Sequence, residues 1–91
     1  MEFEWDQKKA ESNLKKHGIS FQEAASVLGD ALSITYPDPD HSMGERRFIT
    51  VGTSRFGRVL LVAHTDRGKN IRIISARKTT RLERRYYEEG E

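Results

Sequence analysis

The pattern of hydrophobic and polar positions predicts two short helices at the start of the chain. Asp6 is a good N-cap for a first helix, which the glycine at position 18 ends. Ser20 and Glu23 form a Ser-x-x-Glu capping box that opens a second helix over residues 21–28. The apolar side of this second helix consists of Ala24, Ala25, Val27 and Leu28.

From residue 32 onward the apolar positions follow the period-two alternation of half-buried strands. Short turns that contain glycine separate the last three strands and predict an antiparallel meander. A Thr80–Glu83 capping box then opens a third helix, which Gly90 can end. The four predicted strands are Leu32–Tyr36, Arg46–Thr53, Arg58–Asp66 and Asn70–Arg77. The order predicts an α+β fold with two N-terminal helices, a four-stranded antiparallel sheet and a C-terminal helix, with the helices on one side of the sheet.

Length and composition narrow the class of protein. The 91 residues suffice for one domain, which we expect to span positions 1–91. The chain has no cysteine, which excludes disulfides, thiolate metal sites and a cysteine nucleophile. The longest apolar run, Val59–Ala63, is too short to cross a membrane, and the acidic opening MEFEWD is unlike a signal peptide. We therefore expect a cytoplasmic protein.

The charges are unevenly distributed along the chain. Lys and Arg exceed Asp and Glu by two overall, but residues 46–85 hold twelve basic residues, ten of them Arg, against Asp66 and Glu83. Arginine binds phosphate through two parallel hydrogen bonds and stacks on bases. A solvated, arginine-rich face is the alternative interpretation, but this asymmetry favours a surface that binds nucleic acid.

Strand alternation suggests where chemistry could take place. His64 shares a face with Leu60 and Val62, and a three-residue loop at 67–69 would set His64 directly opposite Arg72. An imidazole can move a proton, and a guanidinium can hold a phosphate. Cleavage of RNA by its own 2′-hydroxyl needs little more than a base near that hydroxyl, cations on the phosphate and an acid for the leaving 5′-oxygen, and it requires no metal ion. The same alternation places Arg72 and Arg77 on opposite faces, unless a twist or bulge intervenes.

Each candidate also has a structural interpretation. His64 can be a partly buried sheet histidine that Asp66 or Thr65 satisfies, and Glu83 can be a helix cap as well as a general base. Tyr86 can belong to the core or stack on a base. The histidines and carboxylates lack metal-ligand spacing, so we predict no metal site and no cofactor.

The motifs, taken in order, resemble those of BrnT-type toxins over nearly the whole chain. In the first half they are Phe3-Glu-Trp-Asp6, Lys9, Asn13, Lys16-His-Gly18, Ser20-Phe21 and Glu23-Ala24. In the second half they are Glu45-Arg46, Gly52, Gly57-Arg58, His64-Thr65, Arg67, Ile71-Arg-Ile-Ile-Ser-Ala-Arg77, Glu83-Arg84 and Tyr86.

This resemblance implies a RelE-like, microbial-RNase-like fold and an endoribonuclease toxin of a type II toxin–antitoxin system that inhibits translation. It also implies a BrnA-like antitoxin that contains a ribbon-helix-helix part. The complex of toxin and antitoxin would bind operator DNA only through this antitoxin. The candidate catalytic residues are His64, Arg67, Arg72, Arg77 and Glu83. The candidate RNA-binding residues are Lys9, Arg46, Arg58 and Tyr86. A non-catalytic nucleic-acid-binding module is the main alternative, and a structural partner subunit is a third.

Overall fold

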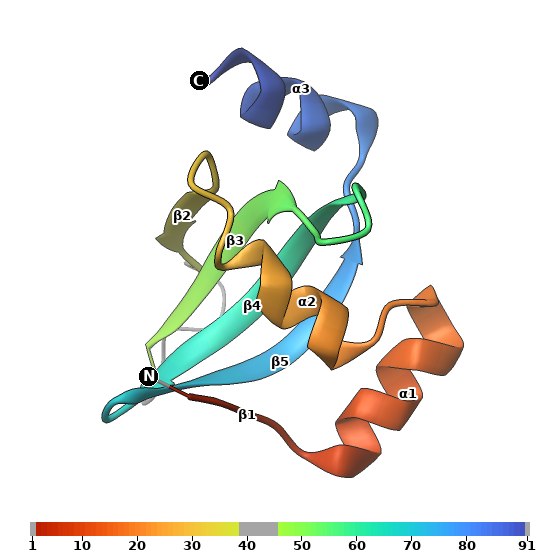
Figure 1. The fold of residues 1–91 in the computed structure, drawn as a ribbon, viewed down its shortest axis with the longest axis vertical. Helices are drawn as coiled ribbons and strands as arrows, with labels where there is room; N and C mark the ends of the chain where they lie inside the picture. The colour runs from red at the N-terminus through yellow and green to blue at the C-terminus, as the bar shows by residue number, and fades with distance from the viewer. Residues whose placement is uncertain (1, 39–45, 91) are drawn as a thin grey trace.

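The computed structural model describes residues 2–38 and 46–90, which form three helices and one sheet (Figure 1). The helices are α1 (Gln7–His17), α2 (Phe21–Val27) and α3 (Arg81–Glu89). The strands are β1 (Phe3–Glu4), β2 (Ile34–Pro37), β3 (Arg47–Thr53), β4 (Val59–Arg67) and β5 (Asn70–Lys78). The α+β class, the three helices and the four predicted strands are confirmed.

The sheet has five strands in the order β1-β5-β4-β3-β2, and β1 is parallel to β5. The prediction of a four-stranded, purely antiparallel sheet is therefore wrong, and the RelE-like arrangement is not shown. A strand of only two residues, Phe3–Glu4, shows no alternation in the sequence, so the pattern gave no sign of it.

The helix ends follow the predicted capping chemistry with one exception. Asp6 accepts the backbone N–H groups of Lys8 and Lys9 at 2.8 and 3.1 Å. Gly18 ends α1 with a φ of 72°, a left-handed conformation that glycine adopts without strain. The capping box of α3 is complete, but in α2 only half of the box forms. Ser20 caps the N–H of Glu23, whereas the Glu23 carboxylate turns away to Arg58.

Helices α1 and α2 lie against one face of the sheet (Figure 1). The core there is formed by Ile19, Phe21, Ala24 and Val27 against Leu60, Val62, Ile73 and Ala76, all nearly or fully buried. Asn13 joins α1 to β5, since its amide donates to the carbonyl of Ala76 at 2.9 Å and its oxygen accepts the N–H of Ala76 at 3.1 Å. We call the opposite side of the sheet the open face.

The β4–β5 hairpin differs from the predicted register. Its loop has two residues, because Arg67 pairs with Asn70, and Thr65 rather than His64 lies opposite Arg72. A shift between Ala63 and His64 leaves Ile74 as the extra residue of a β-bulge in β5. The predicted pairing of His64 with Arg72 is therefore wrong, and His64 lies opposite Ile73.

Helix α3 is an exception to the prediction that the helices share one side of the sheet. It stands at the end of the sheet (Figure 1). Its Tyr87 hydroxyl lies 2.8 Å from the hydroxyl of Thr53, on the open face of β3. Its first turn also reaches the open face, through an ion pair between Glu83 and Arg77. Successive residues of a strand point to opposite faces of the sheet. This alternation does not predict which of the two faces a helix at the end of the chain will cover.

Candidate active site

An ion pair on the open face joins the end of β5 to α3. Arg77 donates from Nη1 and Nη2 to the two carboxylate oxygens of Glu83, each at 2.9 Å. Glu83 Oε1 also accepts the backbone N–H of Thr80 at 2.8 Å. These hydrogen bonds, led by those from Arg77, lower the pKa of Glu83 to about 2 although partial burial opposes the shift. The Glu83 carboxylate is therefore ionised throughout the physiological pH range.

A small apolar pocket lies beside this pair. Its volume is about 230 Å³, and it is lined by Ile34, Tyr36, Val51, Glu83, Tyr86 and Tyr87. Burial, followed by the negative charge of Glu83, raises the pKa of Tyr36. The phenol thus keeps its proton at neutral pH and can donate it. The open-face site, which we define as Tyr36, Arg77 and Glu83 around this pocket, combines a carboxylate, a cation and a hydroxyl donor.

Other cations extend along the same face away from this site. Arg47 and Arg72 both pair with Thr65, one on each side of it, and side chains opposite each other in a sheet share a face. Arg72 lies 3.7 Å from Glu4, so part of its charge is neutralised by β1. Alternation along β4 places the exposed Arg67 beyond Thr65, at the hairpin. The open face therefore carries arginines from its hairpin end to its α3 end.

His64 is not part of this face. It is 5% exposed, and its Nε2 lies 2.7 Å from the hydroxyl of Thr50 on the helix-covered side. Its ring stacks on Phe48 with centroids 6.0 Å apart, and its Nδ1 is buried without a partner among the described residues. Burial lowers the pKa of His64 below its ordinary value of 6.5, so the ring is uncharged at neutral pH. The interpretation of His64 as a buried sheet histidine is confirmed, although its partner is Thr50 rather than Asp66 or Thr65.

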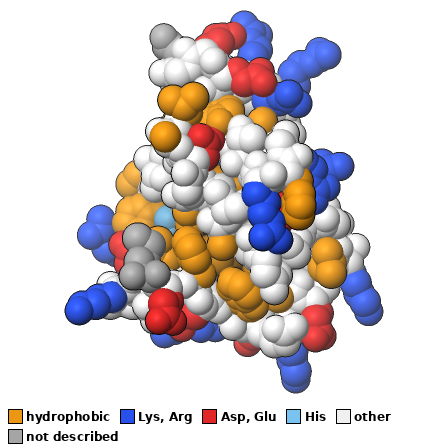
Figure 2. All heavy atoms as spheres, viewed as in Figure 1, with side chains coloured by type: hydrophobic (Ala, Val, Ile, Leu, Met, Phe, Trp, Pro, Cys, Tyr) orange, Lys and Arg blue, Asp and Glu red, His pale blue; other side chains and the backbone are white. Residues whose placement is uncertain are grey.

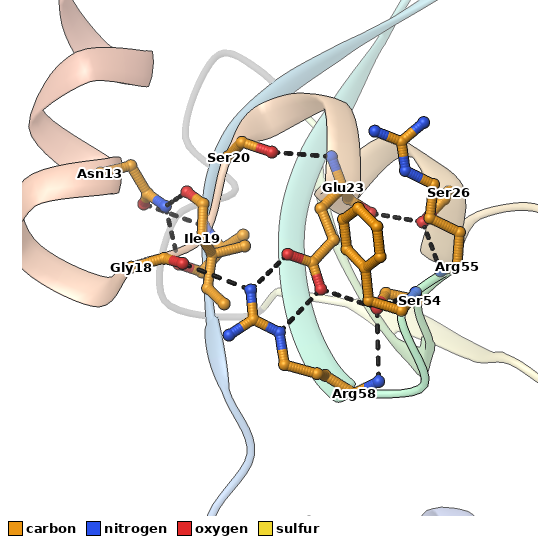
Figure 3. Close-up of polar contacts among 11 residues, drawn as sticks. Asn13, Gly18, Ile19, Ser20, Glu23, Ser26, Ser54, Arg55 and Arg58 are labelled. Atoms are coloured by element: carbon orange, nitrogen blue, oxygen red, sulfur yellow. Dashed lines mark hydrogen bonds and ion pairs between the residues drawn. The ribbon is translucent and has the colours of Figure 1, made fainter.

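Arg58 is held within the fold by a buried carboxylate (Figure 3). Glu23 is 2% exposed and accepts Arg58 Nε at 2.9 Å and the hydroxyl of Ser54 at 2.7 Å. Arg58 Nη2 donates to the second Glu23 oxygen and, at 3.3 Å, to the carbonyl of Gly18. The hydrogen bond from Arg58 lowers the pKa of Glu23. This network fixes α2 to the β3–β4 turn.

The remaining candidates lie apart from the open-face site. Lys9 is exposed on α1, and the guanidinium carbon of Arg46 lies 5.4 Å from the ring of Phe48 beside His64. On the helix-covered face the Lys and Arg side chains lie mostly around the rim rather than in one patch (Figure 2). Only Tyr86, which is 55% exposed and lines the pocket, joins Arg77 and Glu83. His41, a weaker candidate in a predicted polar turn region, lies outside the described residues.

The described residues contain neither a cluster of metal ligands nor a membrane-spanning helix. Within 2–38 and 46–90 no three His, Asp or Glu side chains are grouped so that they could hold a metal ion. No helix in the same ranges is long and apolar enough to cross a membrane.

Comparison with known proteins identifies the family. The family model described as the ribonuclease toxin BrnT of type II toxin–antitoxin systems matches residues 5–83. This chain belongs to the BrnT family. Its fold is similar to the 1.1 Å crystal structure of the Brucella abortus ribonuclease toxin BrnT, with a TM-score of 0.70 and 21% identity over 89% of this chain and 99% of that one. No curated protein matches the chain. A toxin of this family implies an antitoxin partner.

Two residues of the open face, Tyr36 and Arg47, were not among the predicted site residues. Tyr36 lies in a correctly predicted strand, and the alternation places it with Ile34, so the signal was present in the sequence. Its proximity to Glu83 depends on α3 crossing to the open face, which no local pattern encodes. Arg47 is one of ten arginines in residues 46–85, and the sequence does not set it apart from the others. Its pairing with Thr65 in the sheet is what places it on the open face.

Proposed function

We propose that this BrnT-family protein is a metal-independent endoribonuclease that cleaves RNA at the open-face site and so inhibits translation. The observation that carries the proposal is the Arg77–Glu83 ion pair beside Tyr36 at the edge of a pocket. The family supplies the class of reaction, and these residues supply a base, a cation and an acid on one face.

In the proposed reaction the RNA 2′-oxygen attacks the adjacent phosphorus and the bond to the 5′-oxygen breaks. Glu83 accepts the proton of the 2′-hydroxyl, and Tyr36 donates its phenolic proton to the leaving 5′-oxygen. Arg77 holds the phosphate and stabilises the charge that develops on it. The products are a 2′,3′-cyclic phosphate and a free 5′-hydroxyl, and solvent returns the proton from Glu83 to Tyr36.

The low pKa of Glu83 would make it a weak base while Arg77 holds it. A bound phosphate competes with Glu83 for the guanidinium of Arg77. The hydrogen bonds from Arg77 are the largest cause of the low pKa of Glu83, so their loss to the phosphate raises that pKa. Substrate binding therefore raises the basicity of Glu83 at the moment when a base is needed. Arg72, Arg67 and Arg47 extend the phosphate-binding surface along the sheet, and Tyr86 provides an exposed ring on which a base can stack.

The antitoxin partner is proposed to be a BrnA-like protein with a ribbon-helix-helix part. The arginines of the open face suit an acidic segment of such a partner, which would exclude RNA by covering the site. Operator DNA would be bound through the antitoxin alone.

The experiment that tests the function uses purified protein freed from its antitoxin. We expect it to cleave RNA in the presence of EDTA and to leave cyclic phosphate ends. Expression should arrest growth and degrade RNA, and co-expression of the neighbouring antitoxin gene should relieve both. Salt-dependent RNA binding without any cleavage would overturn the proposal in favour of a non-catalytic binding module.

A further inference from the structure

A second cleft lies on the other side of the junction between β5 and α3. Its volume is about 470 Å³, and its lining includes four cations and no carboxylate. The cationic side chains are those of Arg58, Lys78, Arg81 and Arg84. We call this cavity the basic cleft.

The nearby acids do not neutralise the basic cleft fully. Glu23 is buried and already holds Arg58, while Glu83 turns to the opposite side to bind Arg77. Among the described residues Arg84 makes only an exposed ion pair, with Glu88 of the same helix, and such a pair contributes little to stability. The structure gives Lys78 and Arg81 no carboxylate partner within 2–38 and 46–90, so their charges remain available to an anion.

The basic cleft and the open-face site share the same two elements. Arg77 pairs with Leu61 on the open face, whereas the next residue, Lys78, pairs with Leu60 on the opposite face. On α3, Glu83 faces the pocket, and Arg81 and Arg84 face the cleft. A single-stranded nucleic acid that passes the start of α3 can therefore contact both the basic cleft and the open-face site.

An exposed aromatic residue adjoins the cleft. Phe56 is 64% exposed, although it is a large hydrophobic side chain, and it directly precedes Gly57, which lines the cleft. The guanidinium carbon of Arg55 lies 4.9 Å from the centre of its ring. Cationic grooves flanked by exposed rings are the usual means of binding single-stranded nucleic acid, because the cations take the phosphates and the ring takes a base.

We propose that the basic cleft binds phosphates of the RNA substrate outside the bond that is cleaved, with Phe56 stacking on a flanking base. The proposal rests on the proposed ribonuclease function and assigns the cleft to substrate affinity rather than to the chemical step.

The test compares two variants that each remove two positive charges. Lys78→Gln with Arg81→Gln alters the cleft, and Lys15→Gln with Lys16→Gln, at the exposed end of α1, is the matched control. The binding probe is a 2′-O-methyl RNA of about 12 nucleotides, which lacks the attacking hydroxyl and can span both sites. We expect the cleft variant to bind it about tenfold more weakly, with a salt slope lower by about 1.4, whereas the control binds like wild type.

Cleavage kinetics separate affinity from chemistry. On a long RNA the cleft variant should have a raised KM and the wild-type kcat. On an RNA dinucleotide, which fills only the open-face site, it should match wild type. Unchanged binding and KM, or an equal loss in the control variant, would overturn the proposal, as would a fall in kcat alone.

The two proposals fail in different ways. If wild-type protein cleaves no RNA, the ribonuclease function fails, but the binding comparison still decides whether the cleft holds phosphates. Phe56→Ala gives an independent measurement, because it should weaken binding of the same probe without changing the salt slope. Thermal unfolding of each variant shows that any loss occurs in folded protein.

Discussion

Arg72 and Arg77 project from the same face of the sheet, although they lie an odd number of positions apart in one strand. Their partners in β4 are Thr65 and Leu61, and the bulge at Ile74 takes up the extra residue between them. A rise of about 3.3 Å per residue along β4 places the two arginines about 13 Å apart. The bulge therefore brings onto one face two arginines that a regular strand would place on opposite faces, as the proposed phosphate-binding surface requires.

Replacement of these two arginines should affect activity unequally. We expect Arg77→Ala to lower the rate of RNA cleavage about a hundredfold, because it removes the cation nearest to Glu83. Arg72→Ala should lower it about tenfold, since Glu4 already neutralises part of its charge. Cleavage of a labelled RNA and the arrest of growth on expression are the measurements.

Arg85→Ala is the control for both variants. Arg85 is an exposed residue of α3 that pairs only with Glu89 among the described residues, so its loss should leave cleavage unchanged. If Arg72→Ala and Arg77→Ala both remain fully toxic, the site lies elsewhere.

Tyr36→Phe tests the proposed general acid. The substitution keeps the ring in the pocket and removes the proton that the leaving oxygen would receive. We expect kcat to fall about a hundredfold with little change in KM. Because the pKa of Tyr36 is raised, wild-type activity should also persist into alkaline solution before the phenol ionises.

Tyr86→Phe is the matched control at the same pocket. It keeps the ring that is proposed to stack on a base, so its kinetics should match wild type. A Tyr36→Phe variant with the wild-type kcat would remove Tyr36 from the mechanism.

The Glu83 carboxylate should make stability depend on pH. Its pKa is about 2 in the folded protein, against 4.5 as the ordinary value, so its stabilising effect is present above pH 4.5 and is lost as the pH falls toward 2. The shift corresponds to at most about 3 kcal/mol, and the exposure of Arg77 to solvent reduces this to about 1 kcal/mol.

Urea unfolding of wild type and Glu83→Gln measures this effect. The difference in unfolding free energy between the two proteins should be largest at neutral pH and should shrink by more than half at pH 3. The comparison cancels the other carboxylates with lowered pKa values, such as Asp6 and Asp30. An equal difference at both pH values would contradict the role of the charged pair.

The sequence was most informative where local chemistry decides the structure. The caps at Asp6 and Thr80 each use a side chain within a few residues of the groups that it satisfies, so their patterns could be recognised. The family resemblance, carried by motifs along most of the chain, was likewise confirmed.

Features that depend on distant contacts were mispredicted. The bulge at Ile74 and the two-residue hairpin loop displaced His64 from Arg72, since a slip of one residue changes every opposite pair. Glu23 looked like the second half of a capping box, yet Arg58 and Ser54 compete for its carboxylate from the β3–β4 turn. Arg77 and Glu83 were both candidates, but their contact depends on the path of the chain between β5 and α3.

Arg58→Ala should destabilise the fold more than its exposure suggests. It would leave the Glu23 carboxylate buried, with Ser54 as its only hydrogen-bonding side chain in the described part of the protein. Adding Glu23→Gln should restore part of the lost stability, because the amide is neutral and less costly to bury than an unpaired charge. Thermal unfolding of the single and double variants measures the recovery.

Arg55→Ala provides the control, since Arg55 is an exposed residue in the same turn. Its unfolding temperature should stay close to that of wild type. If the double variant is no more stable than Arg58→Ala, the buried charge is not the cause of the instability.

His64 should affect stability rather than catalysis. Burial lowers its pKa below the ordinary value of 6.5, so the unfolded chain takes up a proton more readily than the folded protein does. The protonated ring carries an N–H on both nitrogens, and the described residues offer no acceptor for the one on Nδ1. The contribution of neutral His64 to the free energy of unfolding should therefore be fully present above pH 6.5 and should decline as the pH falls below that value.

The measurement is urea unfolding at pH 7.5 and 5.5 for wild type, His64→Gln and His17→Gln, the last being an exposed control at the end of α1. His64→Gln should lose much of the decline between the two pH values, whereas His17→Gln should retain it. His64→Gln should also cleave RNA at the wild-type rate, because its ring lies on the helix-covered side of the sheet and does not face the open-face site. A large loss of cleavage in folded His64→Gln protein would show that the histidine takes part in the reaction after all.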